Sequence, residues 1–347
     1  MLSKRLAAAV TLTLATAAPV LAVPAAAQAA VPAVAKNWSA LMYRSLTADT
    51  TMATLRTTLA TQKKALLVRH TEVTVATKSD SAAQRTVSAA TVAHQDARDR
   101  LAAAEERLKA AKGDLTLVNR QRPRKKAAVD RAKKAVVTAT TTRDIRRKKL
   151  HDAAALLAAA RTSAKGTAAE LGTAVAAHVA ATTAIEQTQT RISTAPTAAA
   201  LAAQAATVSR SVVDQVRPSF TVADTSSVYG VTVHRNVAFA FKRMVDDAAK
   251  AGVQISGGGF RTKERQIELR TINGCPDVWT APSSSCRVPT AIPGRSLHEI
   301  GLAVDISSGG KTISRKTKAF TWLQANAAKY GYVNLPSEAW HWSITGN

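Results

Sequence analysis

Two short stretches near the C-terminus combine the residue types of a metal-dependent hydrolase. His298 and Asp305 stand seven residues apart, and His341 follows in a separate stretch. Imidazole nitrogens and carboxylate oxygens are good zinc ligands, and three protein ligands leave one position of a tetrahedral ion open. Glu338, three residues before His341, is placed to act as a general base on a water molecule at that position. These four residues predict a catalytic zinc site.

A glycine-rich segment supplies one more candidate. Arg261 follows Gly257, Gly258 and Gly259 on what reads as a turn. Its guanidinium group could stabilise the oxyanion that forms when a carbonyl is attacked, or it could bind a substrate carboxylate through two parallel hydrogen bonds. The residues favour neither role, so Arg261 is predicted as a catalytic residue with both alternatives open.

The elements that must position these residues read as a small α+β domain over residues 217–347. Asp305 falls on an apolar strand expected over residues 301–306, and His298 falls in the turn before it. Amphipathic helices are expected over residues 236–252, 263–272 and 317–330, and further short strands over residues 253–256, 331–333 and 338–343. This order predicts helices packed on a small, mostly antiparallel sheet.

The residues around the candidate ligands form a longer motif. The pattern Ser-x-His-x-x-Gly-x-Ala-x-Asp is followed by Glu-x-Trp-His, at the positions Ser296, His298, Gly301, Ala303, Asp305, Glu338, Trp340 and His341. This pattern resembles the signature of the D-alanyl-D-alanine carboxypeptidases of VanY type within the M15 zinc peptidases. The segment from Ser256 to Gln266 resembles the Gly-Tyr-Arg-Ser segment of the same family. The resemblance covers about residues 217–347 and does not extend to the residues before them.

The resemblance implies a function for the predicted site. It implies a single Zn²⁺ ion bound by His298, Asp305 and His341, with Glu338 as the catalytic base. It also implies that the substrate is a stem peptide of peptidoglycan. A contact between Gln266 and the substrate rests on the resemblance alone.

Two residues depart from the family pattern. Ala339 and Phe260 stand where the family usually has proline and tyrosine, and because neither is a ligand, the departures bear only on the shape of the substrate pocket. Ser296 is expected either to cap the turn before His298 or to contact the substrate. Trp340 and Trp342 alternate about His341, so one should pack and the other should line the cleft. Trp340 is the candidate for substrate binding.

The long stretch before this domain, residues 30–216, reads as successive helices. Apolar residues recur in a seven-residue pattern over residues 87–118, which predicts a coiled coil, and a second such seam covers residues 129–160. Pro123 between the two seams breaks the helix, so an antiparallel hairpin is predicted. With the weaker patterns included, we expect four or five helices in an all-α antiparallel coiled-coil arm of modest stability, because alanine-rich seams bury little apolar area.

The first residues predict export. Residues 1–29 read as a signal peptide, with a basic start, an uncharged apolar stretch and a small-x-small cleavage site at Ala27-Gln28-Ala29. In an oxidising compartment the only two cysteines, Cys275 and Cys286, are expected to form a disulfide. The mature protein is therefore predicted to be secreted and associated with a bacterial cell wall.

The charge of the chain predicts what the helical arm could bind. The formal net charge is +25, of which residues 31–215 carry +16. Such a positive field favours anionic polymers. For an exported protein these are cell-wall polymers or lipid head groups rather than nucleic acid, since no nucleic-acid-binding motif accompanies the charge. The alternative is a solvated helix surface, and a protein partner or self-association through the coiled coil is also open.

Taken together, the sequence predicts an exported zinc metallopeptidase that removes a terminal D-alanine from stem peptides. An endopeptidase that cuts peptidoglycan cross-links is the alternative within the same chemistry. An alternative of another class is an interaction protein whose coiled coil recruits a cell-wall or division complex, with the peptidase domain secondary.

Overall fold

The structure is a computed structural model that describes residues 31–347, so the predicted signal peptide over residues 1–29 lies outside the described residues. The chain divides into two compact units. Of the described residues, 31–49 and 196–347 form one unit, and 50–195 form the other. Each unit is described by itself.

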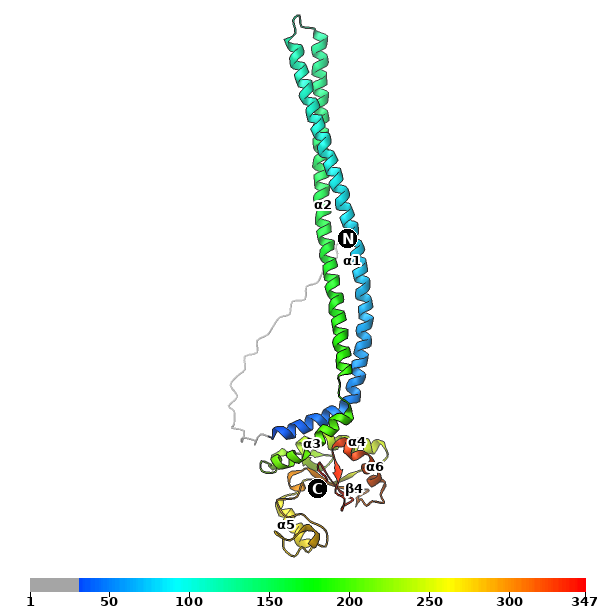
Figure 1. Cartoon of the computed structure of the whole chain (residues 1–347), viewed down its shortest axis with the longest axis vertical. Coiled ribbons are helices and arrows are strands. Elements are labelled where there is room, and N and C mark those ends of the chain that lie inside the picture. The colour runs from blue at the N-terminus through cyan, green and yellow to red at the C-terminus, as the bar shows by residue number, and fades with distance from the viewer. Residues whose placement is uncertain (1–30) are drawn as a thin grey trace. The chain divides into compact units, whose positions relative to one another are not determined.

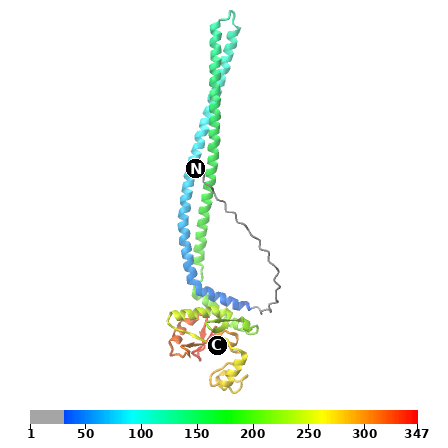
Figure 2. The same cartoon turned by 180° about the vertical axis from the view of Figure 1, so that it is seen from behind.

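Residues 50–195 form an antiparallel helical hairpin. It is built from most of α1 (Ala33–Arg120) and α2 (Lys126–Ser193), which run side by side (Figure 2). Two contacts across the pair fix the direction. Thr167 Oγ1 donates to Asp80 Oδ1 at 3.1 Å, and the His70 and His178 rings lie with their centroids 6.0 Å apart. The buried seam between the helices is rich in alanine, which agrees with the slender hairpin expected from the sequence.

The described residues before position 217 form three helices rather than the four or five predicted. The first of them, α1, is continuous over Ala33–Arg120, because no glycine or proline interrupts the chain from Ala33 to Lys112. The predicted break near Pro123 is present, a second break lies near Pro196, and the third helix, α3, spans Ala198–Val216. Among the described helices, α2 is the one that by length and composition alone could cross a membrane.

The unit that contains the predicted site is an α+β structure, as expected. Its main sheet has five strands, and every pair is antiparallel. Four of them follow the order β3-β4-β7-β6, and β5 pairs with the end of β4 that β7 does not reach. The strands are β3 (Ser256–Gly258), β4 (Ala303–Ser308), β5 (Lys311–Thr312), β6 (Val333–Asn334) and β7 (His341–Ser343). A separate hairpin is formed by β1 (Thr225–Val228) and β2 (Val231–His234). The helices are α4 (Arg235–Lys250), α5 (Lys263–Ile272) and α6 (Lys318–Asn326) (Figure 1).

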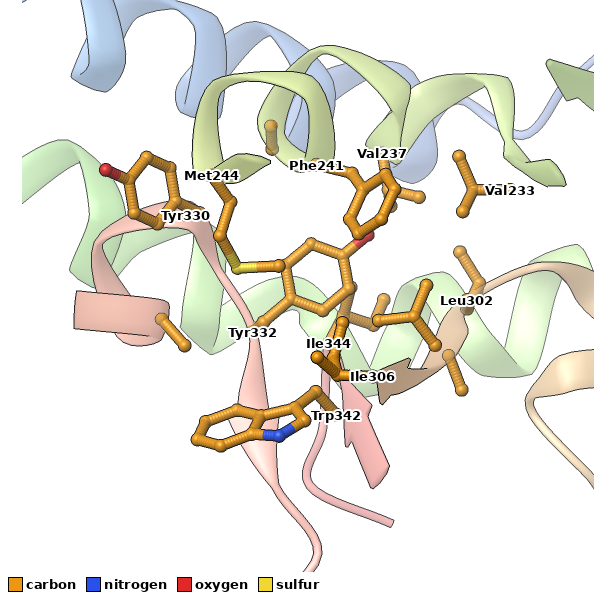
Figure 3. Close-up of a cluster of buried hydrophobic side chains, with 14 of the residues drawn as sticks. Val233, Val237, Phe241, Met244, Leu302, Ile306, Tyr330, Tyr332, Trp342 and Ile344 are labelled. Atoms are coloured by element: carbon orange, nitrogen blue, oxygen red, sulfur yellow. The ribbon is translucent and has the colours of Figure 1, made fainter. Parts of the chain in front are cut away.

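One face of the main sheet forms the core of this unit. Val304 and Ile306 of β4 are buried, and so is Trp342, which is paired with Val304 across β4 and β7. Figure 3 shows Ile306 and Trp342 among the buried side chains that include Phe241 of α4. Because side chains alternate along a strand, the residue between Val304 and Ile306 points to the opposite face. That residue is Asp305.

Two helical segments from outside residues 217–347 complete the same core. Trp38 and Met42 of α1 are almost fully buried, and the indole Nε1 of Trp38 donates to Ser209 Oγ of α3 at 3.0 Å. Val212 and Val216 of α3 are buried in the same cluster. The compact unit therefore extends beyond residues 217–347, the range expected from the sequence.

The loop between α5 and β4 is held by covalent and polar links. Cys275 and Cys286 form the predicted disulfide. Arg270 of α5 is fully buried and donates to the backbone carbonyls of Thr290, Asp277 and Ala281. One side chain thus holds three points of the loop together. These three hydrogen bonds and the disulfide join this loop and α5 into one packed lobe (yellow in Figure 1).

Candidate metal centre

Three predicted ligands meet at one point on the open face of the main sheet. His298 Nε2 lies 3.1 Å from Asp305 Oδ1, His341 Nδ1 lies 3.0 Å from the same oxygen, and the two nitrogens are 3.2 Å apart. His298 and His341 are buried, and Asp305 is partly exposed. The structure thus brings together residues that are up to 43 positions apart in the sequence.

The geometry of this triangle fits a zinc ion. Ligand atoms about 2.0–2.1 Å from a tetrahedral ion lie about 3.3 Å from one another, which is close to the three observed separations. The donor set of two imidazoles and one carboxylate is also one that zinc favours. Three ligands leave the fourth position for water or substrate.

Backbone carbonyls orient both imidazole rings. His298 Nδ1 lies 2.7 Å from Gly259 O, and His341 Nε2 lies 2.9 Å from Asn347 O. Because a carbonyl only accepts, each of these nitrogens carries the proton, and the lone pair of the other nitrogen faces the ligand triangle. Such partners fix the tautomer that metal binding requires.

The backbone around His298 explains the spacing of the motif. His298 begins a single 3-10 turn, His298–Ile300, which Gly301 ends with φ of +66°. A side chain at Gly301 would meet the backbone nitrogen of His234 at 2.5 Å, so the position requires glycine for conformation and for space. The chain then enters β4, where Asp305 stands directly opposite His341 of β7. The turn and the strand pairing together set the ligand positions.

Arg261 lies beside the ligands and is anchored on three sides. Its Nη1 donates to Asp305 Oδ2 at 3.3 Å, its Nε to Gln266 Oε1 at 2.7 Å and its Nη2 to Ser296 Oγ at 3.4 Å. Since Asp305 Oδ2 faces Arg261, Oδ1 faces the two histidines. Burial lowers the pKa of Arg261, and the charge of Asp305 opposes this effect. Arg261 therefore orients the carboxylate ligand, in addition to the roles expected from the sequence.

Gln266 is placed differently from the expected substrate contact. Its side chain is fully buried, accepts from Arg261 and donates through Nε2 to Ala291 O at 2.7 Å. Because the oxygen and the nitrogen of its side-chain amide are both hydrogen-bonded, Gln266 links Arg261 to the packed lobe formed by α5 and the disulfide loop. Ser296 is also buried, and its hydroxyl accepts from the backbone nitrogen of His298 at 3.3 Å, as the turn-capping alternative predicted.

The remaining predicted residues line a cavity of about 600 Å³ beside the ligands. Glu338 and Trp340 line this cavity together with Asp305 and His341. Trp342 is buried instead. Of the two tryptophans that flank His341, Trp340 therefore lines the cavity and Trp342 packs in the core. Burial raises the pKa of Glu338 and the nearby Asp305 adds to this, whereas the positive charges beside it act in the opposite direction. A carboxylate with a raised pKa is a suitable general base.

Sequence reasoning missed a clamp on the loop before His298. Arg217, at the end of α3, donates to the carbonyls of Gly294, Arg295 and Ser296 at 2.8 to 3.2 Å. From the other side, the Glu299 carboxylate accepts from the backbone nitrogens of Gly294 and Ser296 at 2.9 and 3.1 Å. No local spacing predicts the contacts of Arg217, because its partners are 77 to 79 residues away.

Fold and site together define an α+β domain with a mononuclear metal centre on the open face of its sheet. Residues 230–347 match the family model of the VanY D-alanyl-D-alanine carboxypeptidases. The C-terminal part of the chain is therefore similar to a VanY-type domain.

Two curated proteins are similar to the same part of the chain. The D-alanyl-D-alanine carboxypeptidase of Enterococcus faecalis (strain ATCC 700802 / V583) is 30% identical over 118 residues, which are 29% of this chain and 44% of that protein. The YodJ protein of Bacillus subtilis (strain 168) is 31% identical over 107 residues, which are 29% of this chain and 38% of that protein. The chain thus spans less than half the length of these relatives.

A solved structure is also similar to part of the chain. The crystal structure of a mutant of the vancomycin resistance D,D-pentapeptidase VanY, in complex with Zn(II), aligns with a TM-score of 0.29 and 23% identity. The alignment covers 35% of this chain and 78% of the chain in that crystal structure.

The clamp predicts that Arg217 positions the metal ligands without touching them. In the Arg217→Ala variant three carbonyls lose their donor, so the loop before His298 should loosen and zinc affinity should fall about 10-fold to 100-fold. Arg217→Lys should give a smaller loss, because a single ammonium group cannot replace the planar fork of donors. Zinc affinity is measured by competition with a chromophoric chelator.

Arg210→Ala is the matched control, since Arg210 is exposed on the same helix. A thermal melt of each metal-free variant separates local loosening from global unfolding. Unchanged zinc affinity in Arg217→Ala would show that the clamp has no role in positioning the ligands.

Proposed function

We propose that this protein is an exported zinc metallopeptidase that removes the terminal D-alanine from stem peptides of peptidoglycan. The observation that carries the proposal is the ligand triangle of His298, Asp305 and His341, with Glu338 and Arg261 around the same cavity. The similarity of residues 230–347 to the VanY family supports the substrate class. The predicted signal peptide and the disulfide support action outside the cytoplasm.

In this proposal each residue has a defined part in the hydrolysis. Bound zinc supplies Lewis acidity, which polarises the scissile carbonyl and makes water a better nucleophile at neutral pH. Glu338 takes a proton from the attacking water and returns it to the leaving amine. Arg261, next to the ligands, places positive charge where the oxyanion develops. Gln266 and Ser296 keep Arg261 in place.

The first experiment tests the reaction and its metal. Purified protein without the signal peptide is incubated with muropeptides, and the products are weighed by mass spectrometry. We expect loss of one alanine, abolition by a chelator and recovery on addition of zinc. The activity of the His298→Ala variant should be at least about 100-fold lower than that of the wild type.

Other products would favour the alternatives. Conversion of cross-linked dimers into monomers would indicate an endopeptidase. No product with zinc-loaded protein would favour the interaction-protein alternative, in which the helical hairpin recruits a cell-wall complex.

A second experiment tests the base. Protonation removes the lone pair that Glu338 needs, so kcat/KM should fall as the pH decreases through its pKa. Glu338→Gln should lose about 10²-fold to 10⁴-fold in kcat and should no longer show this acid limb, while it still binds one zinc ion. An acid limb of unchanged position in the glutamine variant would assign it to another group.

We also infer that the helical hairpin holds the enzyme near anionic cell-wall polymers. Residues 107–134, at the turn of the hairpin, contain eleven Lys and Arg residues against two Asp residues. The five basic residues at the turn itself are exposed, namely Arg120, Arg122, Arg124, Lys125 and Lys126. Multivalent charge pairing of this kind weakens steeply as salt increases.

This inference is tested by co-sedimentation with a polyglycerol phosphate polymer. Changing the five turn residues to glutamine should weaken binding and flatten its salt dependence. Changing the exposed Lys63 and Lys64 of α1 to glutamine controls for general loss of charge. Equal effects of the two sets per charge removed would assign binding to the whole hairpin rather than to its turn.

A further inference from the structure

The metal centre lies where two cavities meet. The first, called here the arginine cavity, is the cavity of about 600 Å³ beside Glu338 and His341. The second, called the sheet cavity, is about 660 Å³ and lies over β3, β4 and β5. Asp305, Trp340 and Val288 line both. Because Asp305 is a metal ligand, a peptide held at the metal has space on both sides of the scissile bond.

Small, uncharged residues form the floor of the sheet cavity. Strand register places Gly258 opposite Asp305, Ser256 opposite Ser307 and Thr312 opposite Ser307 on the next strand, so these residues share the face of the sheet that carries the metal site. Apart from Asp305, no residue that lines this cavity is charged. A floor of glycine and hydroxyl groups suits an extended, uncharged part of a peptide.

The arginine cavity has the opposite character. Three arginines line it, Arg217, Arg261 and Arg295. Arg217 and Arg261 donate to groups of the protein, as described above. Arg295 is exposed, and no side-chain hydrogen bond or ion pair joins it to any of residues 31–347. Its guanidinium group is therefore available for an anionic group of a ligand, and a carboxylate matches its geometry.

Glu338 gives the cleft a direction. It lines the arginine cavity and not the sheet cavity. The group that returns a proton to the leaving amine must come within hydrogen-bond distance of that nitrogen. The residue that leaves must therefore lie on the Glu338 side of the metal, and the acyl part must lie on the other side.

We propose that the substrate binds across the metal with its acyl part over β3, β4 and β5 and its leaving residue in the arginine cavity, where Arg295 binds the free carboxylate. The proposal rests on the proposed function and adds the direction of binding and a specificity residue. Hydrolysis breaks the amide C–N bond. The hydroxyl of water goes to the acyl carbon, and its proton goes through Glu338 to the amine of the leaving amino acid.

The test of the carboxylate site uses two peptides that differ only at the C-terminus. One N-acylated pentapeptide ends in D-Ala-D-Ala with a free carboxylate, and the other ends in the corresponding amide. The wild-type protein should prefer the acid. Arg295→Ala should raise KM for the acid about 10-fold to 100-fold and leave the amide unchanged, since it removes one charged hydrogen-bonding partner. Arg295→Lys should recover part of the preference, and Arg210→Ala should behave as wild type.

The test of the acyl side fills the sheet cavity. Thr312→Trp places a large side chain on its floor, whereas Lys311→Trp changes the preceding residue of the same strand, which does not line the cavity. Thr312→Trp should lower kcat/KM at least tenfold for the pentapeptide and leave N-acetyl-D-Ala-D-Ala unchanged. Lys311→Trp should change neither.

The outcomes separate this inference from the proposed function. Hydrolysis by wild type with equal rates on acid and amide, or with an equal response of both to Arg295→Ala, would overturn the carboxylate site. Equal loss on the long and the short peptide in Thr312→Trp, or no loss on either, would overturn the direction of binding. Absence of hydrolysis of every peptide by zinc-loaded wild type would overturn the proposed function itself.

Discussion

The antiparallel pairing of β4 with β7 is the constraint on which the rest of the site depends. It places Asp305 directly opposite His341, and the period of two along each strand sends both side chains to the face opposite the core. Val304 and Trp342, one position away on each strand, are buried on the other face. A shift of this pairing by one residue would exchange the ligands with core residues. The hydrophobic core therefore fixes the register that the metal centre needs.

The polar partners of the ligands form a second level of organisation. Each histidine directs one nitrogen to a backbone carbonyl, and the carboxylate of Asp305 is shared between the ligand triangle and Arg261. The loop before His298 is in turn held by Arg217 and by Glu299. These contacts are buried or partly buried, so the loss of one partner leaves a desolvated group without compensation, which costs more than the hydrogen bond itself contributes.

The core of this unit includes helical segments that come before and after the hairpin of residues 50–195 in the sequence. This affects how the domain can be studied. Trp38 of α1 and Val212 of α3 are buried in the same cluster as the sheet. A fragment that begins at residue 217 would expose the apolar surface that these helices cover, although it retains every ligand. A comparison of such a fragment with the longer chain would mix loss of stability with loss of regulation, so substitutions in the intact chain are the cleaner experiments.

The sequence alone determined the local features. The motif pointed to His298, Asp305 and His341, which the structure brings together, Pro123 predicted the helix break near it, and helix α5 spans the expected residues 263–272. These features depend on neighbouring residues. The tertiary structure decided which distant residues meet, including the clamp by Arg217, the burial of Gln266 and the contribution of α1 to the core. Such contacts join residues up to 171 positions apart, so they follow from packing and desolvation rather than from any local pattern.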